Sequence, residues 1–291
     1  MSVLNQIYAT PSRVRGAYRL VLNSDQHKLN RKTAEEILSP QSLQPDVNHD
    51  KFEHLKMIRG VINETIKMGL FEANGEEISL TKQLEGMTDE NLALNIIRLF
   101  TSEENNENDD FLRLMSWFLM QDPYCAPGTW DEANIALEKQ IGGSMLGCND
   151  NRFGQFTHWL VFLGFGWRYS FKGERDKITP DPSKLISMFL PLIFEDNEIL
   201  SIQEFIQKLA TLCPVFEEGK IRTEINQEYQ IESLPPKHLS KVTSFALFHL
   251  GEQESIELAS KSDADLYVLS DGDKEQRVSE IKWNGRGVPQ G

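Results

Sequence analysis

The stretch from residue 150 to 179 constrains the fold of this chain more than any other. Its first half carries four apolar side chains at spacings of three and four residues: Phe153, Phe156, Leu160 and Leu163. This spacing is typical of a helix with one buried face. Asp150 or Asn151 can cap the start of such a helix. Gly164 predicts its end, because glycine adopts the left-handed conformation without a steric penalty.

The second half of the same stretch has the alternation of a β-strand. Large aromatic residues alternate with small or polar ones, at Phe165, Trp167, Tyr169 and Phe171. This period of two predicts a strand. Lys172 and Gly173 then predict a turn, and residues 177–179 predict a short second strand. A helix, a glycine and a β-hairpin in this order form the second half of a winged helix.

The same order occurs twice more. A helix from about Lys51 to Met68 is followed by Gly69 and by a hairpin whose turn we predict at Asn74-Gly75. Near the C-terminus, a helix over 239–250 is followed by Gly251 and by strands over 256–259, 265–269 and 277–283. Repetition of a whole unit is stronger evidence than any single match. We therefore predict a mainly α chain with small β wings, an α+β fold of three tandem winged-helix units.

The charge distribution suggests the domain boundaries. Five of the eight residues from 103 to 110 are acidic, which is typical of a solvated loop and alternatively of a docking site for a basic partner. The candidate docking residues are Glu103, Glu104, Glu107, Asp109 and Asp110. We predict winged-helix unit 1 at residues 1–88, a linking helix and acidic loop at 89–110, unit 2 at 111–195, and unit 3 with its C-terminal hairpin at 196–291.

The composition is that of an ordinary folded protein. The net charge is −14, and the chain has no run of 18 apolar residues and no N-terminal signal pattern. We therefore expect a cytoplasmic protein that does not enter a membrane. The three cysteines, Cys125, Cys148 and Cys213, are widely spaced. They are expected to be free thiols and not disulfide partners or zinc ligands.

No pattern in the sequence predicts catalysis. Phosphate-binding glycine loops, the G-x-S-x-G elbow and the H-E-x-x-H pair are all missing, and the six histidines are scattered. We expect no catalytic residue, no metal, no cofactor and no small-molecule substrate. A distant alternative is a metal-dependent nuclease, because Asp263, Asp265, Glu280 and Lys282 resemble part of a nuclease pattern. A solvated hairpin explains these four residues more simply.

Two segments are locally basic on an otherwise acidic chain. Residues 1–38 and 151–177 each carry a net charge of +3. In unit 2 we expect Arg152, Gln155 and His158 on the exposed helix face, beside a wing with Lys172, Arg175 and Lys177. The candidates in unit 1 are Arg13, Arg15, Arg31 and Lys32. Winged helices also serve as protein-docking modules, and the overall acidity favours that use over direct DNA contact.

The aromatic residues raise a further possibility. Aromatic rings can stack on the bases of single-stranded nucleic acid. The five tryptophans are Trp117, Trp130, Trp159, Trp167 and Trp283. Most of them fall at helix or strand positions that face inward, so we expect core packing and not base stacking.

Two framework patterns carry a family resemblance. Residues 152–166 read R-F-x-x-F-x-x-W-x-x-F-L-G-F-G, and the helix over 239–250 is followed by Asp263-Ala264 and Arg277-Val278-Ser279. With the order of units, they make the chain resemble the DpdG family. DpdG is the G protein of the Dpd cluster, which inserts 7-deazaguanine derivatives into DNA and restricts unmodified DNA.

The resemblance implies a non-catalytic accessory role and carries over no catalytic residue. The first hypothesis is therefore an adaptor or DNA-recognition subunit of a bacterial DNA-modification, restriction or anti-phage complex. Its expected partners are the other proteins of that complex, with double-stranded DNA as a second candidate. A DNA-binding transcriptional regulator is the alternative.

Overall fold

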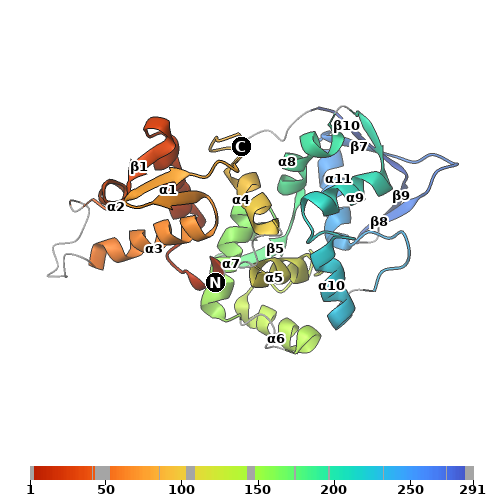
Figure 1. The fold of residues 1–291 in the computed structure, drawn as a ribbon. Helices are drawn as coiled ribbons and strands as arrows, with labels where there is room; N and C mark the ends of the chain where they lie inside the picture. Colours follow the sequence, from red (N-terminus) through yellow and green to blue (C-terminus); the bar gives the residue numbers. More distant parts are fainter. Residues whose placement is uncertain are drawn as a thin grey trace. The chain divides into compact units, whose positions relative to one another are not determined.

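The computed structural model describes residues 3–40, 42, 53–84, 86–102, 109–142, 148–173, 175–195, 197–231, 233–272 and 274–285. The chain divides into two compact units, 1–109 and 110–291. Both consist of α-helices with small antiparallel sheets (Figure 1). The predicted α+β class is confirmed.

The first compact unit packs three helices beside a three-stranded sheet. Its elements are α1 (Pro11–Leu22), β1 (Lys28–Asn30), α2 (Arg31–Leu38), α3 (Glu53–Lys67), β2 (Phe71–Asn74), β3 (Glu77–Leu80) and α4 (Leu92–Thr101), with a short 3-10 turn at each of Val3–Asn5 and Asp25–His27. Helices α1, α2 and α3 pack against one another. The sheet has the order β1-β3-β2, and Ile78 pairs with Leu29 on one side and Ala73 on the other.

The second compact unit contains the remaining elements. They are α5 (Asp109–Leu119), α6 (Trp130–Ile141), α7 (Asp150–Leu163), β4 (Gly166–Tyr169), β5 (Lys177–Pro180), α8 (Ser183–Phe194), β6 (Ile199–Ser201), α9 (Ile202–Leu212), α10 (Lys220–Tyr229), α11 (Lys241–Glu252), β7 (Ile256–Ala259), β8 (Tyr267–Asp271), β9 (Lys274–Val278) and β10 (Glu280–Trp283). Strands β4 and β5 form one hairpin and β8 and β9 another, while β6, β10 and β7 form a sheet in that order.

One helix ending occurs three times. After α3, α7 and α11 the chain takes a left-handed residue, at Gly69 (φ 81°), Gly164 (φ 84°) and Glu254 (φ 57°). The next residue donates its amide to the carbonyl five positions earlier, from Leu70 to Thr65, from Phe165 to Leu160 and from Ser255 to Leu250. A strand then starts at the following residue. Such endings satisfy the last helical carbonyls and turn the chain sharply.

The close of each hairpin repeats as well. The residue after the last strand donates its amide to the carbonyl of the residue before the first strand: Thr81 to Leu70 at 3.1 Å, Asp181 to Phe165 at 3.0 Å, and Asn284 to Ser255 at 3.1 Å. These bonds tie both strands to the end of the preceding helix. The three segments therefore share backbone geometry as well as element order.

An earlier helix in each part of the chain begins in a similar way; α2 and α6 directly precede α3 and α7, whereas α10 lies between α9 and α11. Asn30, Thr129 and Ser201 are the N-caps of α2, α6 and α9, and each side chain accepts a backbone N–H of the first turn. Strands β1 and β6 end at their caps and join the sheets. Before Thr129, Gly128 takes the corresponding place and accepts a hydrogen bond from the amide of Ile178 in β5 at 3.1 Å.

Aromatic side chains fill the centre of the second compact unit. Phe111 and Phe118 both pack edge-on against Phe156, with ring centroids 5.8 and 5.9 Å apart. Phe165 stacks on Phe216 at 5.9 Å. The buried helix face predicted for α7 is confirmed, because Phe153, Phe156, Leu160 and Leu163 are all buried.

Four details of the predicted elements were wrong. The N-cap of α7 is Asn149, whose side chain accepts the amide of Arg152. Helix α11 runs through Gly251, because the left-handed ending is taken by Glu254. Asn74 pairs with Glu77 in the sheet, so the turn residues are 75 and 76. The predicted strand over 277–283 is divided at Ser279 into β9 and β10, which pair with different partners.

The unit boundaries within 110–291 stay a prediction. Helix α8, placed at the end of predicted unit 2, packs against α9 and α11. Among the described residues, the helices are too short or too polar to cross a membrane.

Candidate nucleic-acid interface

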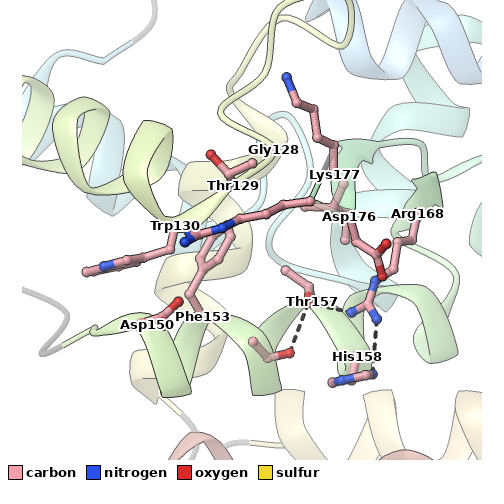
Figure 2. A pocket seen from close by; sticks show the side chains of 13 residues that line it. Gly128, Thr129, Trp130, Asp150, Phe153, Thr157, His158, Arg168, Asp176 and Lys177 are labelled. Carbon is pink, nitrogen blue, oxygen red and sulfur yellow. Dashed lines mark hydrogen bonds between the residues drawn. The ribbon is translucent and has the colours of Figure 1, made fainter. Parts of the chain in front are cut away.

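A pocket opens between α7 and the β4–β5 hairpin (Figure 2). The start of α6 contributes Thr129 and Trp130 to its wall, and α7 contributes Asp150, Phe153, Thr157 and His158. The hairpin contributes Arg168, Arg175, Asp176 and Lys177. The pocket therefore has four basic groups, counting His158, and two carboxylates.

Arg168 is the cation held most firmly in this pocket. Its guanidinium donates to Thr157 Oγ1 at 2.5 Å and lies 3.4 Å from His158 Nδ1, as Figure 2 shows. Thr157 in turn donates to the carbonyl of Gly154 at 2.9 Å. No carboxylate within the described residues forms an ion pair with Arg168. A half-buried guanidinium with only neutral partners keeps its capacity to bind an anion.

The same arrangement changes the pKa of His158. Burial and the neighbouring Arg168 guanidinium lower the pKa of His158 below its usual value, and Asp176 opposes this effect. The imidazole is therefore neutral at neutral pH. The positive charge of the pocket therefore comes from Arg168, Arg175 and Lys177, all on the hairpin.

The other two cations in the pocket are partly neutralised. Arg175 lies 3.3 Å from Asp131, and both side chains are 75% exposed. Lys177 lies 3.4 Å from Glu132, whose other carboxylate oxygen accepts the amides of Gly128 and Thr129. Exposed ion pairs of this kind contribute little and exchange readily with other anions.

The pocket is small and open. Its volume of about 210 Å³ is below the roughly 300 Å³ at which ordinary small-molecule pockets begin. A phosphate group fits this size and charge better than an organic substrate does.

The remaining predicted DNA contacts in unit 2 are mixed. Lys172 is exposed at the tip of the hairpin, and the described part of the chain offers it no ion pair. Arg152 is half-buried. The expectation that Gln155 is exposed was wrong, because its side chain is only 5% exposed. Helical spacing alone could not show this, since the burial of a polar side chain depends on tertiary packing.

The basic candidates of unit 1 are mostly engaged. Arg15 and Arg19 both bind the carboxylate of Asp89, whose pKa they hold well below its usual range. Arg31 donates to Glu35 and Asn63, and Lys32 to Glu76 at 3.0 Å. Arg13 donates to the carbonyl of Tyr8, so its charge is not neutralised there. This patch is less available to phosphate than its sequence suggests.

Two residues on the outward side of α11 have partners within the same compact unit. Asp122 forms an ion pair with Lys241, and the ring of Tyr124 packs edge-on against Phe245 at 6.1 Å. The hydroxyl of Tyr124 donates to Asp271, which raises the pKa of Tyr124 to about 12. These contacts engage Lys241 and Phe245 of α11.

The acidic docking candidates are only partly described. Glu103, Glu104 and Glu107 lie outside the described residues. Asp109 and Asp110 begin α5, where their negative charges interact favourably with the positive end of the helix dipole.

The residues of the nuclease pattern have separate partners. Asp265 pairs with Lys237 at 2.7 Å, Glu280 with Lys261 at 2.7 Å, and Lys282 with Glu257 at 3.4 Å. Among the described residues, no group of three or more His, Cys, Asp or Glu side chains could hold a metal ion.

The aromatic residues divide into two classes. Trp117 and Trp159 are fully buried, as expected for core residues. Trp167 on β4 is 61% exposed, so for this tryptophan the expectation of core packing was wrong. A two-stranded hairpin has one face without a covering layer, and the alternation in the sequence could have indicated this face.

Comparison with known proteins identifies a family. The model of the DpdG-like family matches residues 1–264. The curated proteins and the solved structures gave no match. The family match covers most of the chain, including α7, the β4–β5 hairpin and α11, and the chain belongs to the DpdG-like family.

Proposed function

We propose that this chain is a non-enzymatic subunit of a Dpd-type DNA modification and restriction system, built from three tandem winged-helix units. The helix ending and hairpin closure that follow α3, α7 and α11 carry this proposal. Membership of the DpdG-like family connects the chain with the Dpd system. In this role it acts as an adaptor between DNA and the other proteins of the system.

The order of elements supports the winged-helix assignment. In the first compact unit the order is helix, strand, two helices and two strands, and the strand before α2 pairs with the last strand, giving β1-β3-β2. The sheet β6-β10-β7 follows a similar order, with α8 as the first helix, α10 as an additional helix between α9 and α11, and the hairpin β8–β9 inserted before the last strand. In the unit around α7, one backbone hydrogen bond, from the amide of Ile178 to the carbonyl of Gly128, takes the place of the strand that precedes the second helix in the other units.

The unit around α7 is the one we assign to DNA. Its pocket holds Arg168 without a carboxylate partner in the described residues, and Lys172 stands exposed on the same hairpin. In unit 1, Arg15 is paired with Asp89, and in α11 Lys241 and Phe245 contact Asp122 and Tyr124. Contact with the phosphate backbone positions a protein on DNA without reading its sequence, which suits an adaptor.

The test is duplex binding by the full chain, measured by fluorescence anisotropy as salt rises from about 50 to about 200 mM. Replacing Arg168 and Lys172 by alanine should each weaken binding about fivefold to tenfold and reduce the salt dependence by about one counterion. Lys220→Ala, at an exposed lysine that begins α10, is the matched control and should bind like the parent. Equal affinity of all four proteins would refute the assignment of this unit to DNA.

The adaptor role needs its own test. The tagged chain is purified from its native locus, and the co-purifying proteins are identified. Recovery of other Dpd proteins supports the proposal. Recovery of none, together with binding to one promoter sequence in preference to bulk DNA, would instead identify a transcriptional regulator.

A further inference from the structure

Three aromatic rings form a row, those of Trp167 and Tyr169 in β4 and that of Phe171, two residues after the end of the strand. The ring centroids of Trp167 and Tyr169 are 5.4 Å apart with 27° between their planes, and those of Tyr169 and Phe171 are 5.6 Å apart at 72°. Alternate residues of a strand point to the same face. Trp167 is 61% exposed and Phe171 is 63% exposed. We call these three residues the aromatic row.

The exposure of these rings is unusual in this chain. Phe156, Trp159 and Phe165, which lie nearby in sequence, are completely buried. Leaving large rings in water forgoes the hydrophobic free energy that burial would give. Their mutual packing within the aromatic row leaves most of the Trp167 and Phe171 surfaces free, so a flat ligand can still cover them.

The surroundings of the aromatic row are cationic. Arg168 lies between Trp167 and Tyr169 in the strand and points to the opposite face, where it donates to Thr157. Lys172 is exposed directly after Phe171. Residues 166–180 contain four basic and two acidic residues on a chain whose net charge is −14. The charge of the hairpin therefore complements an anionic ligand.

The position of the hairpin also fits a ligand that approaches from the side. Strand β4 pairs with β5, and the other edge of β5 is bonded to Gly128. Among the described strands β4 has no second neighbour. Within the described strands, the other backbone edge of β4 is therefore unpaired.

Stacked rings beside cations match single-stranded nucleic acid. Each base offers a flat face to an aromatic ring, while the phosphates follow the positive charge. A paired duplex hides the faces of its bases, so it can use the cations but not the rings. An apolar peptide could use the rings but would gain nothing from the cations.

We propose that the aromatic row, with Lys172 directly after it, binds unpaired DNA by stacking bases on Trp167 and Phe171. This inference deepens the proposed function, because it gives the unit around α7 a preference for single-stranded or locally opened DNA. A subunit with this preference directs its partners to DNA whose bases are already unpaired.

The test compares an oligothymidylate strand with a fully paired duplex, each binding to the full chain. The parent should prefer the single strand. The double substitution Trp167→Ala with Phe171→Ala should weaken single-strand binding at least about tenfold and change duplex binding little. Ile135→Ala, at an apolar residue of α6 that is 67% exposed, is the matched control and should have no effect.

A second measurement does not depend on the double variant. Stacking on a base quenches tryptophan fluorescence, so titration with oligothymidylate should quench part of the emission of the parent. The quench should disappear in Trp167→Phe, which keeps an aromatic ring for stacking and so retains most of the affinity. A quench that persists in this variant overturns the proposal, as does single-strand affinity unchanged by the double substitution.

The outcomes separate this inference from the proposed function. Duplex binding that needs Arg168 and Lys172, without any preference for the single strand, overturns the inference and leaves the proposed function standing. Single-strand binding that needs the aromatic row, with no Dpd protein co-purifying, supports the inference and counts against the adaptor role. Binding to neither form of DNA overturns both.

Discussion

The carbonyl oxygen of Gly128 accepts a hydrogen bond from the amide of Ile178 at 3.1 Å, which joins the start of α6 to the second strand of the hairpin. The two backbones are so close that a Cβ atom on Gly128 would lie 2.8 Å from the Ile178 carbonyl oxygen and 3.2 Å from its amide nitrogen. Only glycine fits this approach without a shift of the backbone. The contact also supports the wall of the pocket around Arg168.

Gly128→Ala should therefore destabilise the second compact unit by about 1–3 kcal/mol, the usual cost of overpacking. Gly154→Ala makes the same change in α7, where a Cβ would meet nothing within 4 Å. This control should stabilise the protein by about 0.5–1 kcal/mol, because alanine favours helix. Urea unfolding followed by circular dichroism measures both. Equal effects of the two substitutions would contradict the close contact.

The pKa of His158 should respond to Arg168. Burial lowers this pKa first, and the nearby guanidinium lowers it further because it disfavours the imidazolium. Arg168→Gln removes the charge, so the pKa should rise toward its usual value without reaching it, since the burial remains. Titration of the imidazole ring signals by NMR gives the value directly. Lys220→Ala serves as the control, and an unchanged pKa in Arg168→Gln would show that the two side chains do not interact in solution.

Stability at acid pH should depend on Asp89. Hydrogen bonds from Arg15 and then from Arg19 lower its pKa in the folded chain. The unfolded carboxyl has its usual pKa near about 4, so below that pH the unfolded chain takes up a proton first. The stabilisation is therefore complete above about pH 5, begins to decline as the pH falls through about 4, and is lost fully only below the lowered pKa of the folded chain.

The matching experiment is urea unfolding of the parent and of Asp89→Asn between about pH 6 and pH 3. The parent should lose more stability than the variant over this range, so the difference between the two should narrow toward the acid end. Glu90→Gln is the control for the neighbouring acid. Parallel curves for parent and Asp89→Asn would rule out a stabilising role for this carboxylate.

The three cysteines should differ in reactivity. Cys125 is exposed, whereas burial raises the pKa of both Cys148 and Cys213 to about 12. Because the thiolate is the reactive form, one thiol per chain should react rapidly with a disulfide reagent at pH 8. Cys125→Ser should abolish this fast phase, and Cys213→Ser should leave it unchanged. Two fast thiols in the native protein would contradict the burial of Cys148 or Cys213.

The elements around α6 and α7 were predictable because their signals are local. Thr129 with Glu132 forms the capping box that opens α6, and Gly164 takes the left-handed ending that its position indicated. Apolar spacing correctly identified the buried face of α7. Local backbone preferences and the helical period act within a few residues, so a single sequence contains them.

Other features depended on distant partners. Strand β6 and helix α10 have weak local signals, and β6 is held by its pairing with β10, some eighty residues later in the chain. The helix α11 was expected to end at Gly251. Instead, Glu254, three residues later, takes the left-handed conformation that follows the helix. In both places tertiary packing outweighs the local preference.

The candidate interface shows the same division. The sequence by itself determined that helix, glycine and hairpin follow one another, that the hairpin is basic, and that aromatic residues alternate along β4, because these properties follow from residue order and local sterics. Only the tertiary structure decided that Gln155 is buried, that Asp89 neutralises Arg15, that Arg168 faces neutral partners, and that Trp167 is left in solvent. Exposure and charge pairing depend on which distant residues contact each side chain, and local sequence does not specify those tertiary contacts.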